Sequence, residues 1–463
     1  MRGVLPVALV RVLPSNVEAT VMNRTLGTRP IAVDLFAGAG GLSLGFEQAG
    51  FDITAAVELD PIHAATHKIN FPYTAVICRD VRDLSGDDIR RAAGLGRRAI
   101  DVVVGGPPCQ GFSLIGHRLL EDSRNALVFH FLRLVQELKP CVFVMENVPG
   151  MVTGAHTQLL EELVGRFQDA DYTVRLPYRI LNSGHFGVPQ NRPRLFLVGA
   201  RKGVRLPEYP RPSTALPLNG NGRNGNGVQW ELTLGLPRSP TVEEAIGDLP
   251  EIEQYKTLFD SDTLRVGLRG GSRYARTLRG ALKDTTDFSY RRRRDHRVLT
   301  GCLRAKHTEE SRRRFRATDP GDTESISRFY KLPLEGVCNT LRAGTATDRG
   351  AFSAPRPIHP TSPRCITVRE AARLHSYPDW FRFHRTIWHG FRQIGNSVPP
   401  LLARAVASKL MDALDYKPTR PRQELHLGSD DLASFDMRQA AAHFGVSPTV
   451  IAPRKRVATT ARG

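Results

Sequence analysis

The first 200 residues alternate short apolar runs with amphipathic segments, and this pattern constrains the fold more than any other feature of the chain. Short runs of β-branched residues are typical of buried strands, and amphipathic segments between them are typical of helices that connect parallel strands. The pattern predicts a doubly wound, mostly parallel α/β sheet. We expect its strands at residues 31–35, 53–58, 74–77, 101–104, 141–146 and 194–198.

The fourth predicted strand leads into GGPPCQGFS (105–113), where two glycines and two prolines stop any regular structure. Cys109 therefore follows the carboxyl end of a strand, which is the edge where open α/β sheets bind ligands. A free cysteine is often a buried packing residue. The rigid loop favours the alternative, an exposed thiol that acts as a nucleophile.

A glycine-rich turn, DLFAGAGGLSLG (34–45), connects the first predicted strand to a helix. Such turns occur in many nucleotide-binding folds and in ordinary tight turns, so the context decides what they bind. Glu58 ends the second predicted strand and Asp80 follows the third, which places one carboxylate for ribose hydroxyls and one for an adenine amino group. The chain lacks a P-loop motif, and Phe36 disfavours a pyrophosphate at the helix start. We therefore expect an adenosine site without a triphosphate.

The composition narrows the partners. A net charge of +19 with a pI near 10.1 favours a polyanion such as nucleic acid, although an arginine-rich proteome gives the same bias. The six cysteines are scattered without a CxxC pair, which argues against a zinc site or a disulfide framework. No stretch is long enough to span a membrane, and the N-terminal apolar patch does not read as a signal peptide. We expect a cytoplasmic protein that binds no metal and no membrane.

We expect five parts along the chain. After the sheet-forming residues the alternation of apolar and amphipathic segments ends, and the chain becomes rich in Pro, Gly and Asn. Two predicted helices at 367–375 and 399–414 then return the chain to the sheet. The parts are an N-terminal extension (1–28), a sheet domain (29–201), an irregular second domain (202–336) with a flexible loop at 217–228, a returning segment (337–414) and a tail (415–463).

The irregular second domain carries two basic runs, RRRR (291–294) and RRRFR (312–316), interleaved with aromatic residues. The ordinary interpretation of one such run is a solvated charged face. Two runs in one strand-poor insert favour a surface that contacts phosphates. The residues predicted to make these contacts include Arg291, Arg292, Arg312 and Arg313.

Eight motifs occur in the order typical of one enzyme family. They are DLFAGAGG, VELD with Glu58, CRD with Asp80, PPCQGFS, ENV with Glu146, QxRxR with Arg192 and Arg194, RCITVREAARLHSYP (364–378) and QIGNSVPP (393–400). Together they resemble the DNA (cytosine-5)-methyltransferases that use S-adenosylmethionine. The resemblance spans about residues 31–414 and implies a class I methyltransferase, Rossmann-like fold with its smaller target recognition domain in the long insert.

The chemistry of this family explains why such residues are needed. Carbon 5 of cytosine is a poor nucleophile, and attack of the Cys109 thiolate on carbon 6 turns the ring into an enamine that can take a methyl group. An acid at ring nitrogen 3 lowers the barrier, and Glu146 is the candidate. Asn147 and Val148 are expected to hold its carboxyl group in place.

Arg194, with Arg192 as support, is expected to contact the base carbonyl and to favour the thiolate. The alternative for both arginines is ordinary surface charge. Alternation along a strand puts them on one face, which favours a shared site. The residues implied to bind S-adenosylmethionine, whose product is S-adenosylhomocysteine, are Phe36, Gly38, Gly40, Leu42, Glu58, Asp80, Pro107, Asn396 and Val398.

A cytosine inside a duplex hides carbon 6, so the target base must be flipped out of double-stranded DNA. The segment 110–124 is long enough to close over the flipped base as an active-site lid. Gln110, Ser113 and His117 are its expected DNA-contacting residues. His117 is expected to meet phosphate or solvent rather than to act as a base.

The tail lies beyond the resemblance. FDMRQAAAHFGVSPTVIAPRKR (435–456) resembles half of a helix-turn-helix, and an ordinary amphipathic tail with a basic end explains it equally well.

Several functions need comparison. The leading one is methylation of a specific DNA sequence in restriction-modification, by a monomer with a cognate restriction endonuclease, and a solitary regulatory methyltransferase is nearly as well supported. The second is the same chemistry on cytosine in tRNA. A non-catalytic DNA-binding protein would not need the catalytic motifs, and a hydride-transfer enzyme has no use for PPCQ, ENV or the paired arginines.

Overall fold

The computed structural model describes residues 29–108, 126–154, 156–217, 233–344 and 356–451. The predicted N-terminal extension, most of the predicted loop at 217–228 and Cys109 therefore lie outside the described residues. None of the helices in these ranges combines the length and the apolar character that crossing a bilayer requires.

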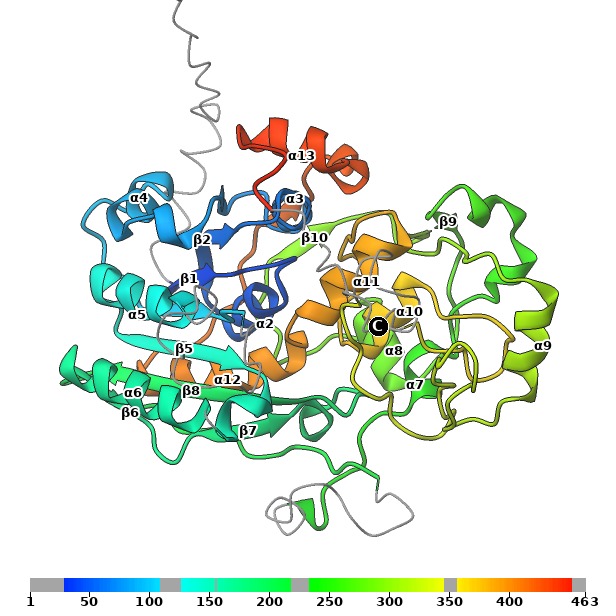
Figure 1. Cartoon of the computed structure of the whole chain (residues 1–463), viewed down its shortest axis with the longest axis horizontal. Helices are drawn as coiled ribbons and strands as arrows, with labels where there is room; N and C mark the ends of the chain where they lie inside the picture. The colour runs from blue at the N-terminus through cyan, green and yellow to red at the C-terminus, as the bar shows by residue number, and fades with distance from the viewer. Residues whose placement is uncertain (1–28, 109–125, 155, 218–232, 345–355, 452–463) are drawn as a thin grey trace, which may run out of the picture.

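An eight-stranded sheet forms one side of the molecule (Figure 1). Its order is β3-β2-β1-β4-β5-β8-β6, and β7 also pairs with β8. Neighbours are parallel from β3 to β5, whereas β8 runs antiparallel to β5, β6 and β7. The strands are β1 (Ile31–Leu35), β2 (Asp52–Glu58), β3 (Ala75–Cys78), β4 (Val102–Gly105), β5 (Val142–Asn147), β6 (Tyr172–Val174), β7 (Arg179–Asn182) and β8 (Pro193–Arg201). The prediction of a doubly wound, mostly parallel sheet is confirmed.

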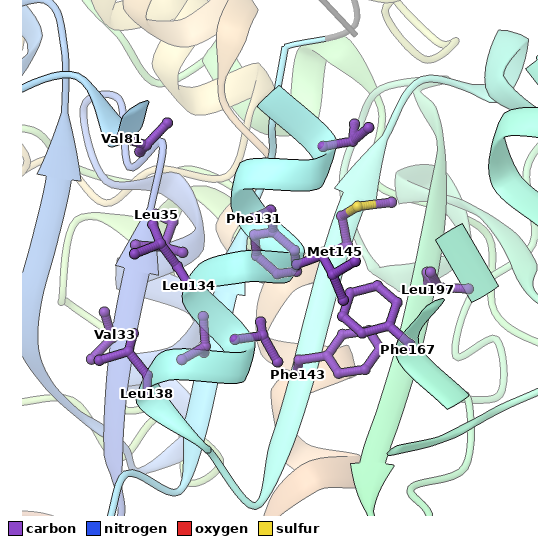
Figure 2. Close-up of a cluster of buried hydrophobic side chains, with 14 of the residues drawn as sticks. Val33, Leu35, Val81, Phe131, Leu134, Leu138, Phe143, Met145, Phe167 and Leu197 are labelled. Carbon is purple, nitrogen blue, oxygen red and sulfur yellow. The ribbon is translucent and has the colours of Figure 1, made fainter. Parts of the chain in front are cut away.

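Both faces of the sheet are buried, which explains why its central strands are continuous apolar runs. On one face, Val33 and Leu35 of β1 belong to a buried cluster to which α5 and α6 also contribute side chains (Figure 2). There the rings of Phe143 and Phe167 stack with centroids 3.9 Å apart. Ala32 points the opposite way, into a second cluster on the other face.

Helices cover the two faces. They are α2 (Gly41–Ala49), α3 (Pro61–Asn70), α4 (Gly86–Ala92), α5 (Ala126–Leu138), α6 (His156–Asp169) and α12 (Pro400–Ala413). Short 3-10 turns lie at Val81–Asp83, Pro149–Val152, Ser183–Phe186, Ile252–Gln254, Lys256–Phe259 and Asp430–Ser434. α12 packs so closely on α2 that a Cβ atom at Gly45 would lie only 2.3 Å from the Cβ of Ala403. α12 corresponds to the helix predicted at residues 399–414, and it returns the chain to the sheet domain.

The insert is irregular and shares its core with the returning segment. Its elements are α7 (Val242–Ile246), β9 (Leu264–Arg265), α8 (Arg273–Leu278), β10 (Arg291–Arg293), β11 (Val298–Leu299) and α9 (Glu309–Ala317), and the returning helices are α10 (Val368–Leu374) and α11 (Ile387–Asn396). Ile246 and Leu374 belong to one buried cluster. Buried Arg373 reinforces the contact by binding Asp248 at 3.0 Å and Asp379 at 2.5 Å.

Arg292 in the middle of β10 is buried. β10 pairs in parallel with β12 (Glu424–His426) of the tail, and the Arg292 side chain has no exposed surface. Its guanidinium donates two hydrogen bonds of 2.8 Å to the carboxylate of Glu47 in α2 and stacks over Trp380. DNA cannot reach this group, so the prediction that Arg292 contacts DNA is wrong. Arg291 and Arg293 are exposed, as strand alternation requires.

Within the described residues of the tail, the α-helix α13 (Met437–Phe444) lies on α3 (Figure 1). Ala440 and Ala441 of α13 are fully buried. Gly445, with φ of 65°, ends the helix in the left-handed conformation that glycine adopts readily. Residues 446–451 form no second helix, and the rest of the predicted helix-turn-helix lies outside the described residues. The helical part of the described tail is therefore one amphipathic helix whose apolar face packs within the fold.

Candidate active site

A cleft of about 760 Å³ opens at the carboxyl edge of the parallel strands. The ends of β1 to β5 meet there because these strands run in the same direction. The predicted site residues that line it are Phe36, Gly38, Leu42, Glu58, Asp80, Pro107, Glu146, Arg192, Arg194, Asn396 and Val398. The structure thus brings residues from motifs far apart in the sequence to one cavity.

The glycine-rich turn between β1 and α2 uses two neighbouring glycines differently. Gly40 has φ of 104°, and a Cβ atom there would lie 2.5 Å from the Phe71 ring. Gly40 therefore faces the protein interior and does not line the cleft, unlike its predicted role. Gly41, which the sequence reasoning missed, does line it, and a Cβ atom there would lie 2.4 Å from the Val398 carbonyl oxygen. Gly41 thus lets the returning segment approach the turn.

The carboxylate of Glu58 is fixed by the backbone. One oxygen accepts the Gly38 N–H and the other accepts the Asp60 N–H, each at 2.8 Å. Burial raises the pKa of Glu58. Because each carboxylate oxygen can accept more than one hydrogen bond, both remain able to bind hydroxyl groups in the cleft.

Asp80 caps the 3-10 turn that follows β3. Its carboxylate accepts the Arg82 N–H at 2.9 Å and the Arg82 guanidinium at 2.6 Å. Burial opposes ionisation, but these hydrogen bonds prevail and the pKa of Asp80 is lowered. Asp80 is therefore an ionised acceptor at neutral pH.

Glu146 and Arg194 form an ion pair inside the cleft. The Arg194 Nε lies 3.0 Å from a Glu146 carboxylate oxygen, and each side chain is 12% exposed. The antiparallel pairing of β5 with β8 sets this distance, since Asn147 lies opposite Leu195. Burial raises the pKa of Glu146, and the charges of Arg194 and Arg192 oppose this rise without cancelling it.

The chain that leads to Cys109 passes directly over Glu146. A Cβ atom at Gly106 would lie 2.8 Å from a Glu146 carboxylate oxygen, so a side chain there would displace the carboxylate. The Asn147 amide donates a hydrogen bond of 3.1 Å to the Pro107 carbonyl. Asn147 thus holds the loop next to Glu146, whereas we expected it to hold the Glu146 carboxyl group itself.

Arg192 is buried and connects separate segments. Its guanidinium donates to the carbonyls of Leu341 and Gly395, both at 2.6 Å, and to that of Ser397 at 2.9 Å. The side chain is too deeply buried for ordinary surface charge. It fixes the segment that carries Asn396 and Val398 against the start of β8.

Sequence reasoning missed a second buried link between the same segments. Gln190 donates to the His375 ring at 3.0 Å, and the other ring nitrogen of His375 lies 3.1 Å from the Ser397 carbonyl oxygen. Both side chains are fully buried. Burial keeps the pKa of His375 well below its ordinary value, so the ring is neutral and can accept from one partner while donating to the other.

Asp34 is a further buried acid, to which the sequence analysis assigned no role. It has no exposed surface, and one of its oxygens has no hydrogen-bond partner among the described residues. The other oxygen accepts the Ser43 hydroxyl at 2.6 Å. Burial raises the pKa of Asp34 to about 7. The acid therefore titrates near neutral pH directly beneath the glycine-rich turn.

Several predicted residues are not brought to the cleft by the described structure. Cys109, Gln110, Ser113 and His117 lie outside the described residues. In the insert, Arg312 is held by the carboxylate of Glu253, and Arg291 and Arg313 are exposed. Within the described ranges, no group of three or more His, Cys, Asp or Glu side chains is arranged to hold a metal ion.

Several known proteins are similar to this chain over most of its length. The profile of the C-5 cytosine-specific DNA methylases matches residues 31–412. The type II methyltransferase M.XorII of Xanthomonas oryzae pv. oryzae is 58% identical over 93% of this chain and 96% of its own length. The type II methyltransferase M.AgeI of Thalassovita gelatinovora is 30% identical over 82% of this chain and 99% of its own.

A solved structure agrees with these relatives. The crystal structure of a DNA modification methyltransferase encoded within a prophage of E. coli matches with a TM-score of 0.64 and 32% identity. The match covers 83% of this chain and 99% of that one. The motifs, the sheet with its cleft and these relatives agree, and the chain belongs to the family of C-5 cytosine-specific DNA methylases.

Proposed function

We propose that this enzyme methylates carbon 5 of a cytosine flipped out of duplex DNA at a specific sequence, through a covalent bond to Cys109. One observation carries the proposal. The loop that leads to Cys109 is tied by Asn147 directly above the Glu146–Arg194 ion pair. The described part of this loop ends at Pro108, beside the acid and the cation, and this supports a role for the adjoining Cys109 as the nucleophile.

S-adenosylmethionine fits the residues of the cleft and, when bound, supplies an electrophilic methyl group. The volume lies within the range of about 300–1,000 Å³ that is common for small-molecule sites. The fixed carboxylate of Glu58 would accept the ribose hydroxyls, and ionised Asp80 would accept the adenine amino group. Phe36 would stack on the adenine, and Asn396 and Val398 would close the site from the returning segment.

The chain's own groups account for activation of the base. The Cys109 thiolate adds to carbon 6, and negative charge then develops on the ring. Glu146, whose pKa is raised by burial, donates a hydrogen bond or its proton to ring nitrogen 3. Arg194 holds the Glu146 carboxyl group and presents a positive charge to the base carbonyl. After carbon 5 has been methylated, loss of its proton breaks the carbon–sulfur bond and releases the thiolate.

Base flipping requires contacts that offset the cost of unstacking, about a few kcal/mol. We assign these contacts to the segment 110–124, with Gln110, Ser113 and His117 as its DNA-contacting residues. The support for this assignment is the position of the segment, because it continues directly from the loop that Asn147 holds.

The exposed arginines of the insert are proposed to contact the DNA backbone, and two variants separate this role from a structural one. Arg313→Ala removes an exposed charge on α9. The slope of log affinity for DNA against log salt concentration is expected to become less steep by about 0.9, the value for one phosphate contact. Arg292→Met is expected to cost about 3–5 kcal/mol of folding stability, because buried Glu47 loses its partner. Anisotropy titrations at several salt concentrations measure the slope for Arg313→Ala, and thermal unfolding measures the stability of Arg292→Met. An unchanged slope for Arg313→Ala argues against the phosphate contact.

Restriction-modification is the biological role we propose. Its support is the type II designation of the relatives that match most of this chain. A modification enzyme of this kind protects the sites of a cognate restriction endonuclease.

The substrate is tested with tritiated S-adenosylmethionine offered separately with duplex DNA and with tRNA. The proposal predicts label in duplex DNA, recovered as 5-methylcytosine at one recognition sequence after hydrolysis and sequencing. Label in tRNA alone would overturn it.

A further inference from the structure

The described tail, residues 415–451, is bound to the rest of the protein at several places. β12 pairs with β10, and the Gly428 N–H donates to the Ile69 carbonyl of α3 at 2.8 Å. Farther along, the Ala433 carbonyl accepts the Arg385 N–H at 2.8 Å. Ala433 also joins Ile69 in a buried apolar cluster, and α13 packs on α3. The tail is therefore a folded part of the enzyme.

The helix that receives the tail begins at the cofactor cleft. Asp60 caps α3, and both Asp60 and His63 line the cleft next to Glu58. Docking on α3 brings the tail to this part of the protein. Ile451, seven residues beyond the end of α13 at Phe444, lines the same cleft and is half-buried.

We propose that residues 415–451 are a strap that completes the cofactor site and that Ile451 is a cofactor-binding residue. The inference rests on the proposed function, in which the cleft binds S-adenosylmethionine. Ile451 adds apolar surface to the cleft that the carboxylate of Glu58 also lines. The family profile ends at residue 412, so the tail contributes this contact from outside the matched domain.

Binding of S-adenosylhomocysteine, measured by calorimetry without DNA, tests the proposal independently of turnover. Ile451→Ala removes apolar contact, and the dissociation constant is expected to rise about three- to tenfold. Val450→Ala is the matched control, because Val450 is also half-buried and apolar but does not line the cleft. It is expected to leave the dissociation constant unchanged. Ala441→Glu places a charge where α13 is buried, undocks the strap and should reproduce the effect of Ile451→Ala.

The outcomes separate the two claims. If the wild-type chain does not bind S-adenosylhomocysteine, the proposed cofactor is wrong. If the wild type binds and Ile451→Ala and Ala441→Glu bind equally well, the strap has no role in the site and this inference is overturned. A larger KM for S-adenosylmethionine at unchanged DNA affinity supports it, since general destabilisation would not select one ligand.

Discussion

Replacing Cys109 by alanine is expected to abolish DNA methylation, with kcat lowered by about 10⁴-fold or more, because the bond to carbon 6 cannot form. None of the described residues that line the cleft is a cysteine, so no neighbouring thiol can substitute. Affinity for S-adenosylhomocysteine and for duplex DNA should stay near the wild-type values. Methyl incorporation with saturating substrates measures the loss.

The other cysteines provide the control. Burial raises the pKa of Cys78, Cys302 and Cys365 to about 12, so they remain protonated at neutral pH. Cys141 precedes β5, is half-buried and has a pKa raised by burial. Cys141→Ala is expected to retain wild-type activity. Substantial methylation by Cys109→Ala would rule out the covalent mechanism.

Glu146→Gln is expected to lower kcat by about 10²- to 10⁴-fold, the range for loss of a general acid. The amide keeps the shape of the carboxyl group but cannot transfer a proton to ring nitrogen 3. Single-turnover methylation of prebound DNA measures the chemical step. Glu161→Gln, at an exposed position on α6, is the matched control and should have no effect.

The pH dependence adds a second test of Glu146. The acid must be protonated to act, and burial raises its pKa above the ordinary value. Ionisation of Cys109 affects the wild type and Glu146→Gln alike, so the ratio of the wild-type rate to the variant rate for the chemical step isolates Glu146. This ratio should fall as pH rises through the raised pKa of Glu146. A ratio that does not change with pH across this range would exclude Glu146 as the acid.

The central strands could be predicted closely because both of their faces are buried. β1 lies at the predicted residues, and β2 to β5 differ from the prediction by one residue at one or both ends. β6 and β7 were not predicted. They are short strands of three and four residues, and β7 is only partly buried, so neither leaves a long apolar run.

The site could be predicted where a motif carries the chemistry, and not where the fold decides a residue's surroundings. Glu58 and Glu146 lie at the carboxyl ends of parallel strands, which must meet at one edge of the sheet, and Arg194 reaches the same edge because it lies at the start of the antiparallel strand β8. Arg292 stands in a basic run that looks solvated, and only the pairing of β10 with β12 turns it inward. His375 meets Gln190 from 185 residues away, a proximity that local patterns cannot reveal.

The covalent bond between Cys109 and cytosine is tested most directly with duplex DNA in which every cytosine carries fluorine at carbon 5. After methyl transfer, the fluorine cannot leave as the proton does, so the adduct cannot resolve. The account predicts a protein–DNA complex that survives denaturation, forms only with S-adenosylmethionine present, and yields a Cys109 peptide bearing a methylated fluorocytosine by mass spectrometry. Failure to trap any adduct on DNA that the enzyme binds, while unmodified DNA is methylated normally, would contradict it.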